Sequence, residues 1–120
     1  MAKPGKTGLA RIVDATAFSI AGLKAAWRHE AAFRQESLLM LLLLPLAMWL
    51  GETPGEKAIM VFVSLLLPLF ELVNSSIEAV VDRISSEHHE LAGRAKDIGS
   101  ALVFVSLLNI LIVWAVIIFS

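Results

Sequence analysis

Four side chains with acidic or amide groups follow one another at helical spacing at the end of an apolar run. They are Glu71, Asn74, Glu78 and Asp82, within the segment ELVNSSIEAVVDR. At 3.6 residues per turn they share one face about 80° wide and extend over roughly 16 Å. One acid at the centre of a membrane helix costs about 2.5–3.5 kcal/mol. We therefore expect this acidic stripe to face other protein or a wet cleft.

Two carboxylates a turn or two apart can divide the work of a phosphoryl transfer. Mg²⁺ accepts few protein ligands and keeps substrate phosphates in its shell, which suits Glu78 near the end of the apolar run. Glu71 lies deeper and suits a general base for a hydroxyl proton, with Asn74 beside it. The alternative is that the stripe only joins helices, a role that fits the lone Asn109 better than two acids.

Charged residues next to the apolar segments could complete such a site. WRHEAAFRQE places Glu30 where it could join Glu78 on a metal ion, or else form an i,i+4 ion pair with Arg34. GRAKD places Lys96 where its ammonium group could offset phosphate charge. Alternatively, Lys96 has no role in a site, and its aliphatic stem lies along apolar surface while its ammonium group reaches the membrane interface.

The segment SSEHHE does not have the pattern of a zinc site. His88 and His89 are neighbours, so on a helix they would point about 100° apart, and the H-E-x-x-H spacing is missing. We expect a surface loop or a helix start there. The chain has no cysteine, which excludes disulfides and thiolate metal sites. It also lacks both glycine-rich nucleotide motifs, so any nucleotide site has to be made without a glycine cradle.

The elements that must position these residues are apolar segments of membrane length. Of the 120 residues, 58% are hydrophobic, and a hydrocarbon core needs a span of about 20 residues. We predict an all-α membrane protein with spans at 31–50, 58–81 and 98–119 in a single domain covering residues 1–120. The formal net charge of −1 gives no reason to expect a nucleic-acid partner.

Basic residues are unevenly distributed between the two sides of the predicted spans. The segment before the first span holds six of them, the loop before the third span holds three, and the loop between the first two spans holds only Lys57. The positive-inside rule therefore places the N-terminus in the cytoplasm. The nine cytoplasmic residues are Lys3, Lys6, Arg11, Lys24, Arg28, Arg34, Arg83, Arg94 and Lys96.

Residues 8–28 show a different, amphipathic pattern. At 100° per residue, six apolar side chains share one arc, which predicts a helix lying on the membrane surface. Phe18 points nearly opposite, either to pack on a neighbouring helix or to stack on a ligand. The six are Leu9, Ile12, Val13, Ile20, Leu23 and Trp27.

Aromatic and helix-breaking residues mark the span boundaries. Trp49 and Trp114 fall near span ends, where amphipathic rings favour the headgroup level. Residues 51–55, with two glycines and a proline, predict a turn. Pro45 and Pro68 lie inside spans, where proline can kink a helix.

The segments GLKAAWRHEAAFRQE and ELVNSSIEAVVDRISSEHHELAGRAKD, with three spans, closely resemble the small prokaryotic diacylglycerol kinases of Gram-negative type. The match covers residues 8–100, and E-x-x-N-S-x-I-E-x-x-x-D together with G-R-A-K-D is highly specific. The resemblance implies ATP-dependent phosphorylation of diacylglycerol to phosphatidic acid, with Mg²⁺, in the bacterial inner membrane. It also implies a homotrimer whose sites are shared between subunits.

The resemblance also implies roles for individual residues. Glu71 matches the family's catalytic carboxylate, assisted by Asn74 and Lys96, while Glu30 and Glu78 match its metal ligands and also contact ATP. Further nucleotide-contacting positions are matched by Arg11, Phe18, Glu87, His88, His89, Lys96 and Asp97. Positions near the lipid are matched by Arg11, Ser19, Lys24, Trp27, Arg34, Gln35, Glu36, Trp49, Glu71 and Ser100.

Three positions depart from the pattern of the family. Phe18 stands where the family often has tyrosine, so ring stacking would survive but a phenol hydrogen bond would not. His29 stands where asparagine is frequent, and Pro68 lies outside the known motifs. Neither His29 nor Pro68 belongs to the catalytic pattern.

Three other functions remain open from the sequence. Undecaprenol could replace diacylglycerol as the lipid alcohol. A small proton-coupled transporter would need an acid in a span, but not Glu30, Lys96 and Asp97 at the edge. A non-catalytic subunit of a membrane complex could carry haem on His88 or His89.

Overall fold

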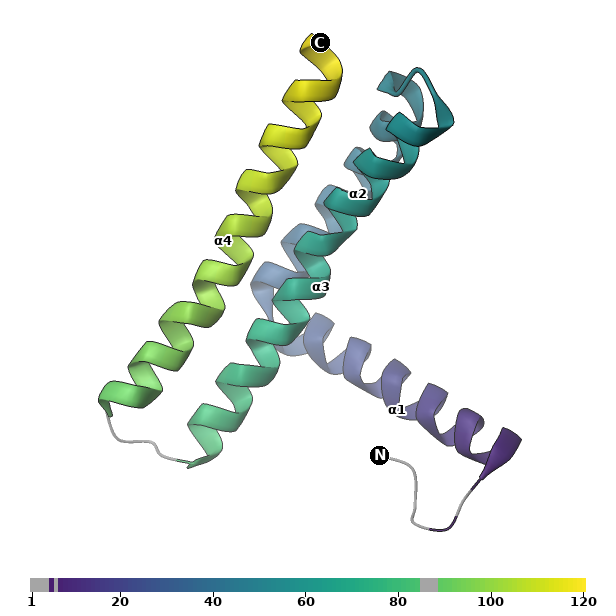
Figure 1. Ribbon diagram of the computed structural model, residues 1–120. Coiled ribbons are helices and arrows are strands. Elements are labelled where there is room, and N and C mark those ends of the chain that lie inside the picture. Colours follow the sequence, from purple (N-terminus) through teal and green to yellow (C-terminus); the bar gives the residue numbers. More distant parts are fainter. Residues whose placement is uncertain (1–4, 6, 85–88) are drawn as a thin grey trace.

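The computed structural model describes residues 5, 7–84 and 89–120, and this part of the chain is all-helical (Figure 1). The helices are α1 (Gly8–His29), α2 (Ala31–Leu50), α3 (Pro54–Ile84) and α4 (Glu90–Phe119). Of these, α2, α3 and α4 are long and apolar enough to cross a membrane. The predicted all-α class with three helices of membrane length is confirmed.

The helices α3 and α4 extend beyond the apolar segments that predicted them. α3 starts at Pro54 and runs to Ile84, and α4 begins at Glu90, eight residues before the predicted span. A helix continues as long as its backbone hydrogen bonds are formed, whether its side chains are apolar or polar. The predicted spans were defined by apolar side chains alone. His89 caps α4 by accepting a hydrogen bond at Nδ1 from the Leu91 amide, at 3.0 Å. His88 and Glu87 lie outside the described residues.

The turn that joins α2 to α3 covers residues 51–53, shorter than the predicted 51–55 because Pro54 and Gly55 already belong to α3, and it depends on close backbone approach. Gly51 is buried, and a Cβ there would lie 2.6 Å from Lys57 Cγ and 2.9 Å from Lys57 N. Only glycine fits this contact without a shift. The helices α2 and α3 each continue through an internal proline, Pro45 and Pro68.

The core lies where α3 packs between α2 and α4, which the ribbon shows side by side (Figure 1). Trp114 is buried there and donates from Nε1 to Ser64 Oγ, at 3.1 Å. Ser64 itself donates to the Met60 carbonyl, at 2.7 Å. Trp114, which was expected near the headgroup level, therefore turns its indole N–H to a partner inside the bundle. The main core residues are Met40, Ala47, Met60, Val63, Leu67, Ile110 and Trp114.

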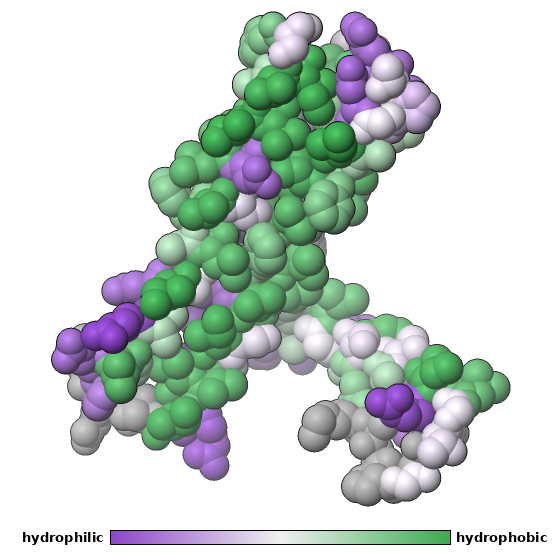
Figure 2. All heavy atoms as spheres, viewed as in Figure 1, coloured by the Kyte–Doolittle hydropathy of each residue, from purple (hydrophilic) through white to green (hydrophobic). Residues whose placement is uncertain are grey.

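The helix α1 leaves the bundle at its junction with α2 and extends away from it (Figure 1). Within α1, all of which is described, Ala26 is the one buried residue. The face of the bundle seen in Figure 2 is mostly hydrophobic, with hydrophilic residues gathered towards its two ends. Exposed apolar side chains over much of a helix bundle are typical of contact with lipid or with other membrane helices.

Candidate active site

A cavity of about 600 Å³ lies between α2, α3 and α4, at the level where α2 begins. It brings together seven of the residues predicted for the site, from three helices and the α1–α2 junction. They are Glu30, Gln35, Glu36, Glu71, Asn74, Glu78 and Ser100. The remaining lining is mainly apolar and comes from Leu39, Leu67, Val103, Phe104 and Leu107. Three of the four residues of the acidic stripe, Glu71, Asn74 and Glu78, thus face a cleft between helices, as their spacing predicted, and Asp82 lies outside it. We call this space the acidic cavity.

The inner end of the stripe is buried. Glu71 is 5% exposed and Asn74 is 7% exposed, because they continue the face on which Leu67 enters the core. Asn74 donates from Nδ2 to Glu78 Oε1, at 3.4 Å. The carboxamide therefore links the deep acid to the shallower, half-buried Glu78. This link between neighbouring turns of α3 holds the Glu78 carboxylate beside the acidic cavity.

Gly99 on α4 makes room for the Asn74 side chain. Gly99 is buried, and a Cβ placed on it would overlap Asn74 Oδ1 and lie 3.4 Å from Asn74 Cγ. The sequence analysis missed this residue, since a single glycine inside a predicted span has many explanations. The only signal was its position within GRAKDIGS, one residue before Ser100.

The acidic cavity concentrates negative charge. The charges of Glu78 and Glu30 act on Glu71, and Glu71 acts in turn on Glu36. None of the described residues that line the cavity is basic. Two buried acceptors, Glu36 Oε2 and Asn74 Oδ1, have no hydrogen-bond partner. Such an arrangement favours a cation, because buried like charges and unsatisfied oxygens are both costly.

The donors fit a magnesium ion better than a metal held by protein alone. Among residues 7–84 and 89–120, no three His, Cys, Asp or Glu side chains are grouped so that they could hold an ion. Mg²⁺ is commonly held by one or two carboxylates together with substrate phosphates. The carboxylates of Glu30 and Glu78, which both line the acidic cavity, match that pattern of one or two hard oxygen donors.

Lys96 lies just outside the acidic cavity and is tied to the end of the stripe. Its Nζ forms a 2.7 Å ion pair with Asp82 Oδ1, which joins α4 to α3. Both side chains are substantially exposed, so this pair adds little to stability. Its effect is to hold a cation one turn beyond Glu78. Asp97 follows Lys96 and is exposed.

The junction between α1 and α2 consists of the single residue Glu30, whose backbone is extended at φ −118° and ψ 103°. Arg34 does not pair with Glu30. Its Nη1 donates instead to the carbonyl oxygens of Trp27, at 2.7 Å, and Arg28, at 3.1 Å. The i,i+4 ion pair considered from the sequence is therefore not formed.

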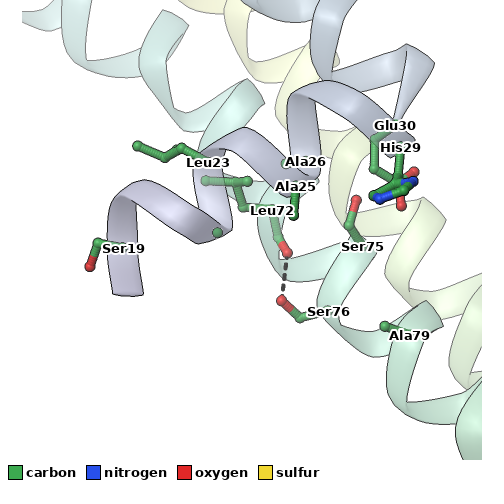
Figure 3. A pocket seen from close by; sticks show the side chains of 11 residues that line it. Ser19, Leu23, Ala25, Ala26, His29, Glu30, Leu72, Ser75, Ser76 and Ala79 are labelled. Atoms are coloured by element: carbon green, nitrogen blue, oxygen red, sulfur yellow. Dashed lines mark hydrogen bonds between the residues drawn. The ribbon is translucent and has the colours of Figure 1, made fainter. Parts of the chain in front are cut away.

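A second cavity, of about 660 Å³, lies between α1 and α3 (Figure 3). Glu30 lines it as well, next to His29. Its α3 side comes from Leu72, Ser75, Ser76 and Ala79, a different face from the acidic stripe. Ser76 Oγ is turned to its own helix and donates to the Leu72 carbonyl, at 2.8 Å. Ser19 is the predicted lipid-contacting residue that reaches this cavity.

Several predicted site residues are not brought to the acidic cavity within one chain. Lys24 and Trp27 line a separate hollow of about 420 Å³ with Phe33. Trp49 is 78% exposed near the far end of α2, roughly 20 Å of helix from Glu36. The others outside the cavity lining are Arg11, Phe18, Ser19, Arg34, His89, Lys96 and Asp97.

Three helices of membrane length around an open acidic cavity are features of an α-helical membrane protein with a polar site between its helices. Acidic side chains gathered on helices of membrane length mark a candidate functional site, since ionisable groups in membranes are expensive.

The comparisons identify the family. Residues 17–118 match the family model described as prokaryotic diacylglycerol kinase. The chain is 53% identical to the diacylglycerol kinase of Pseudomonas aeruginosa over 113 residues, which cover 94% of this chain and 92% of that protein. The Haemophilus influenzae diacylglycerol kinase is 50% identical, with 94% and 96% covered. The Escherichia coli K12 diacylglycerol kinase is 46% identical, with 95% and 93% covered. The chain belongs to the prokaryotic diacylglycerol kinase family.

Proposed function

We propose that the protein transfers the γ-phosphoryl group of ATP to the free hydroxyl group of diacylglycerol and forms phosphatidic acid. The observation that carries this is the acidic cavity, in which the family's acidic residues converge beside apolar helices that a lipid can reach. The match to diacylglycerol kinases over more than nine-tenths of the chain supports the choice of lipid.

The reaction is a direct in-line transfer between ATP and the lipid. The hydroxyl oxygen of diacylglycerol forms a bond to the γ-phosphorus as the bond to the β,γ-bridging oxygen breaks, and ADP leaves. Glu71 accepts the hydroxyl proton as the general base. Its burial at 5% exposure keeps water away from the carboxylate that receives the proton. Asn74 holds the neighbouring Glu78 through its carboxamide.

Glu30 and Glu78 would hold Mg²⁺, and a bound Mg²⁺ would offset the negative charge of the phosphates. Lys96, next to Asp82, adds a positive charge on the ATP side of the site. Arg11, Phe18, His89 and Asp97, with Glu87 and His88 outside the described residues, complete the nucleotide contacts.

The lipid approaches from the bilayer at the level of the acidic cavity. Gln35, Glu36 and Ser100 line the cavity and contact the glycerol headgroup. Helix α1 lies on the cytoplasmic surface of the inner membrane with its apolar side in the lipid, and the N-terminus stays in the cytoplasm. Its residues Ser19, Lys24 and Trp27 contact the substrate along α1, and Trp49 contacts lipid near the other end of α2.

The active unit is a homotrimer with sites shared between subunits. Support comes from the separation seen in one chain, where Arg11 and Phe18 on α1 and Trp49 on α2 do not line the acidic cavity. Neighbouring copies packed through the exposed apolar faces of α2 to α4 would bring such residues to one another's sites.

The test compares Glu71→Gln and Glu78→Gln with Glu52→Gln, an isosteric control in the turn at the other end of α3. Turnover is measured in detergent as phosphatidic acid formed from labelled ATP, Mg²⁺ and diacylglycerol. We expect Glu71→Gln to lose about 10²- to 10⁴-fold in kcat, the usual contribution of a general base. We expect Glu78→Gln to need more Mg²⁺. Near-wild-type turnover of both variants at saturating substrates would show that the assigned chemistry is wrong.

A further inference from the structure

The break between α1 and α2 leaves carbonyl groups that need partners. The last four carbonyls of an α-helix have no partner within it, and here α2 starts after a single residue. The Ala26 carbonyl accepts from the Glu30 amide, at 2.9 Å. The next two carbonyls, of Trp27 and Arg28, both accept from Arg34 Nη1.

Arg34 is suited to this position by both charge and shape. A cation at the C-terminus of a helix is favoured by the helix dipole, and one guanidinium nitrogen carries two hydrogens for two acceptors. The Arg34 backbone amide also donates to the Glu30 carbonyl, at 3.2 Å. Arg34 therefore holds the junction from two sides. Its side chain bonds to the carbonyls of the two residues before Glu30, and its backbone amide bonds to the Glu30 carbonyl.

The residue held in this way is the one that faces both cavities. Glu30 lines the acidic cavity and also the cavity between α1 and α3. Figure 3 shows Glu30 and His29 at the end of α1 where it meets α3. Because Glu30 alone forms the junction, a rotation of α1 would change the Glu30 backbone angles and with them the direction of its carboxylate.

We propose that Arg34 is a positioning residue that clamps the C-terminus of α1 and so places Glu30 for metal binding. In this proposal the Arg34 guanidinium binds backbone carbonyls of α1, whereas the resemblance places Arg34 near the lipid. The kinetic consequence rests on the proposed kinase function, but the clamp itself does not.

The kinetic experiment uses Arg34→Met, which keeps a long apolar stem without donors, and Arg83→Met as the control for loss of one positive charge. We expect Arg34→Met to raise the Mg²⁺ concentration for half-maximal activity by tenfold or more. The KM for diacylglycerol should change less than twofold. An increase in the diacylglycerol KM with an unchanged Mg²⁺ requirement would assign Arg34 to the lipid and overturn the placement of Glu30.

The clamp can be tested without any kinase assay, because the chain has no cysteine. Ala26→Cys places a thiol on the buried side of α1, where it should react slowly with a water-soluble maleimide. In the Arg34→Met background we expect its labelling rate to rise about tenfold. Ala21→Cys, at an exposed position of α1, should label at the same rate in both backgrounds.

Arg34→Lys keeps one donor group and serves as a second variant if the methionine variant does not fold. In this background we expect the thiol introduced by Ala26→Cys to label at a rate between those of the other two backgrounds. Unchanged slow labelling of that thiol in both Arg34 variants would refute the clamp, whatever the kinetics show. If the unmodified protein did not phosphorylate diacylglycerol, the proposed function would fail while the labelling result still decided the clamp.

Discussion

Replacing Gly99 by alanine tests whether the position of the Asn74 side chain affects activity more than it affects the stability of the fold. The new Cβ would overlap Asn74 Oδ1, so the carboxamide has to move. Overpacking of this kind costs about 1–3 kcal/mol. Alanine is better than glycine inside a helix by about 1 kcal/mol. The two effects partly cancel, and we expect the free energy of unfolding to fall by no more than about 2 kcal/mol.

Gly99→Ala should also lower the catalytic rate. A moved Asn74 loses its hydrogen bond to Glu78, and bonds to charged groups contribute about 1.5–3 kcal/mol. The bond length of 3.4 Å favours the lower figure. At about 1.36 kcal/mol per tenfold change in rate, kcat should fall roughly tenfold.

The assay is kcat at saturating ATP, Mg²⁺ and diacylglycerol, with thermal unfolding in detergent measured on the same samples. Gly55→Ala is the matched control, because Gly55 lies in the first turn of α3 with only an ordinary 3.8 Å contact to Thr53 Oγ1. A double-mutant cycle with Asn74→Ala then shows whether Gly99 affects kcat through the Asn74 side chain. If Gly99→Ala lowers kcat equally with and without the Asn74 side chain, Gly99 does not act through Asn74.

Two further substitutions test the fold away from the acidic cavity. Ser64→Ala removes the acceptor of the Trp114 N–H and should lower stability by about 0.6–1.7 kcal/mol, measured by unfolding in SDS, with kcat unchanged. Equal stability would mean that Trp114 finds another partner. Gly51→Ala forces a Cβ against Lys57 and should destabilise the turn by about 1–3 kcal/mol, seen as a lower Tm. A Tm at or above that of the unmodified chain would show that the turn relaxes freely.

Much of the fold could be predicted because lipid leaves few choices. A spanning segment must satisfy its backbone groups internally, so long apolar runs become helices. Helix α2 was predicted with its observed bounds, and the turn after it was indicated by glycine and proline. The extension of α4 back to Glu90 was not predicted, because a polar helical turn has no hydropathy signal.

The site was predictable where its residues share one helix. Glu71, Asn74 and Glu78 lie on one face by arithmetic alone, and the structure places them at one cavity. Contacts between helices were not predictable in this way. Neither the packing of Gly99 on Asn74 nor the bonds from Arg34 to α1 follow from a spacing within one helix.

The length of α3 lets one helix carry both the buried Glu71 and the exposed Asp82. Its 31 residues extend about 46 Å, whereas the hydrocarbon core is about 30 Å thick. Helix α2, with 20 residues, is about as long as that core is thick. Glu71 and Glu78 both line the acidic cavity, at the level where α2 begins, and α3 continues past it to Asp82. The stripe therefore passes from the packed core, where Glu71 is buried, to the exposed ion pair of Asp82 and Lys96, the end that the proposed kinase function gives to ATP.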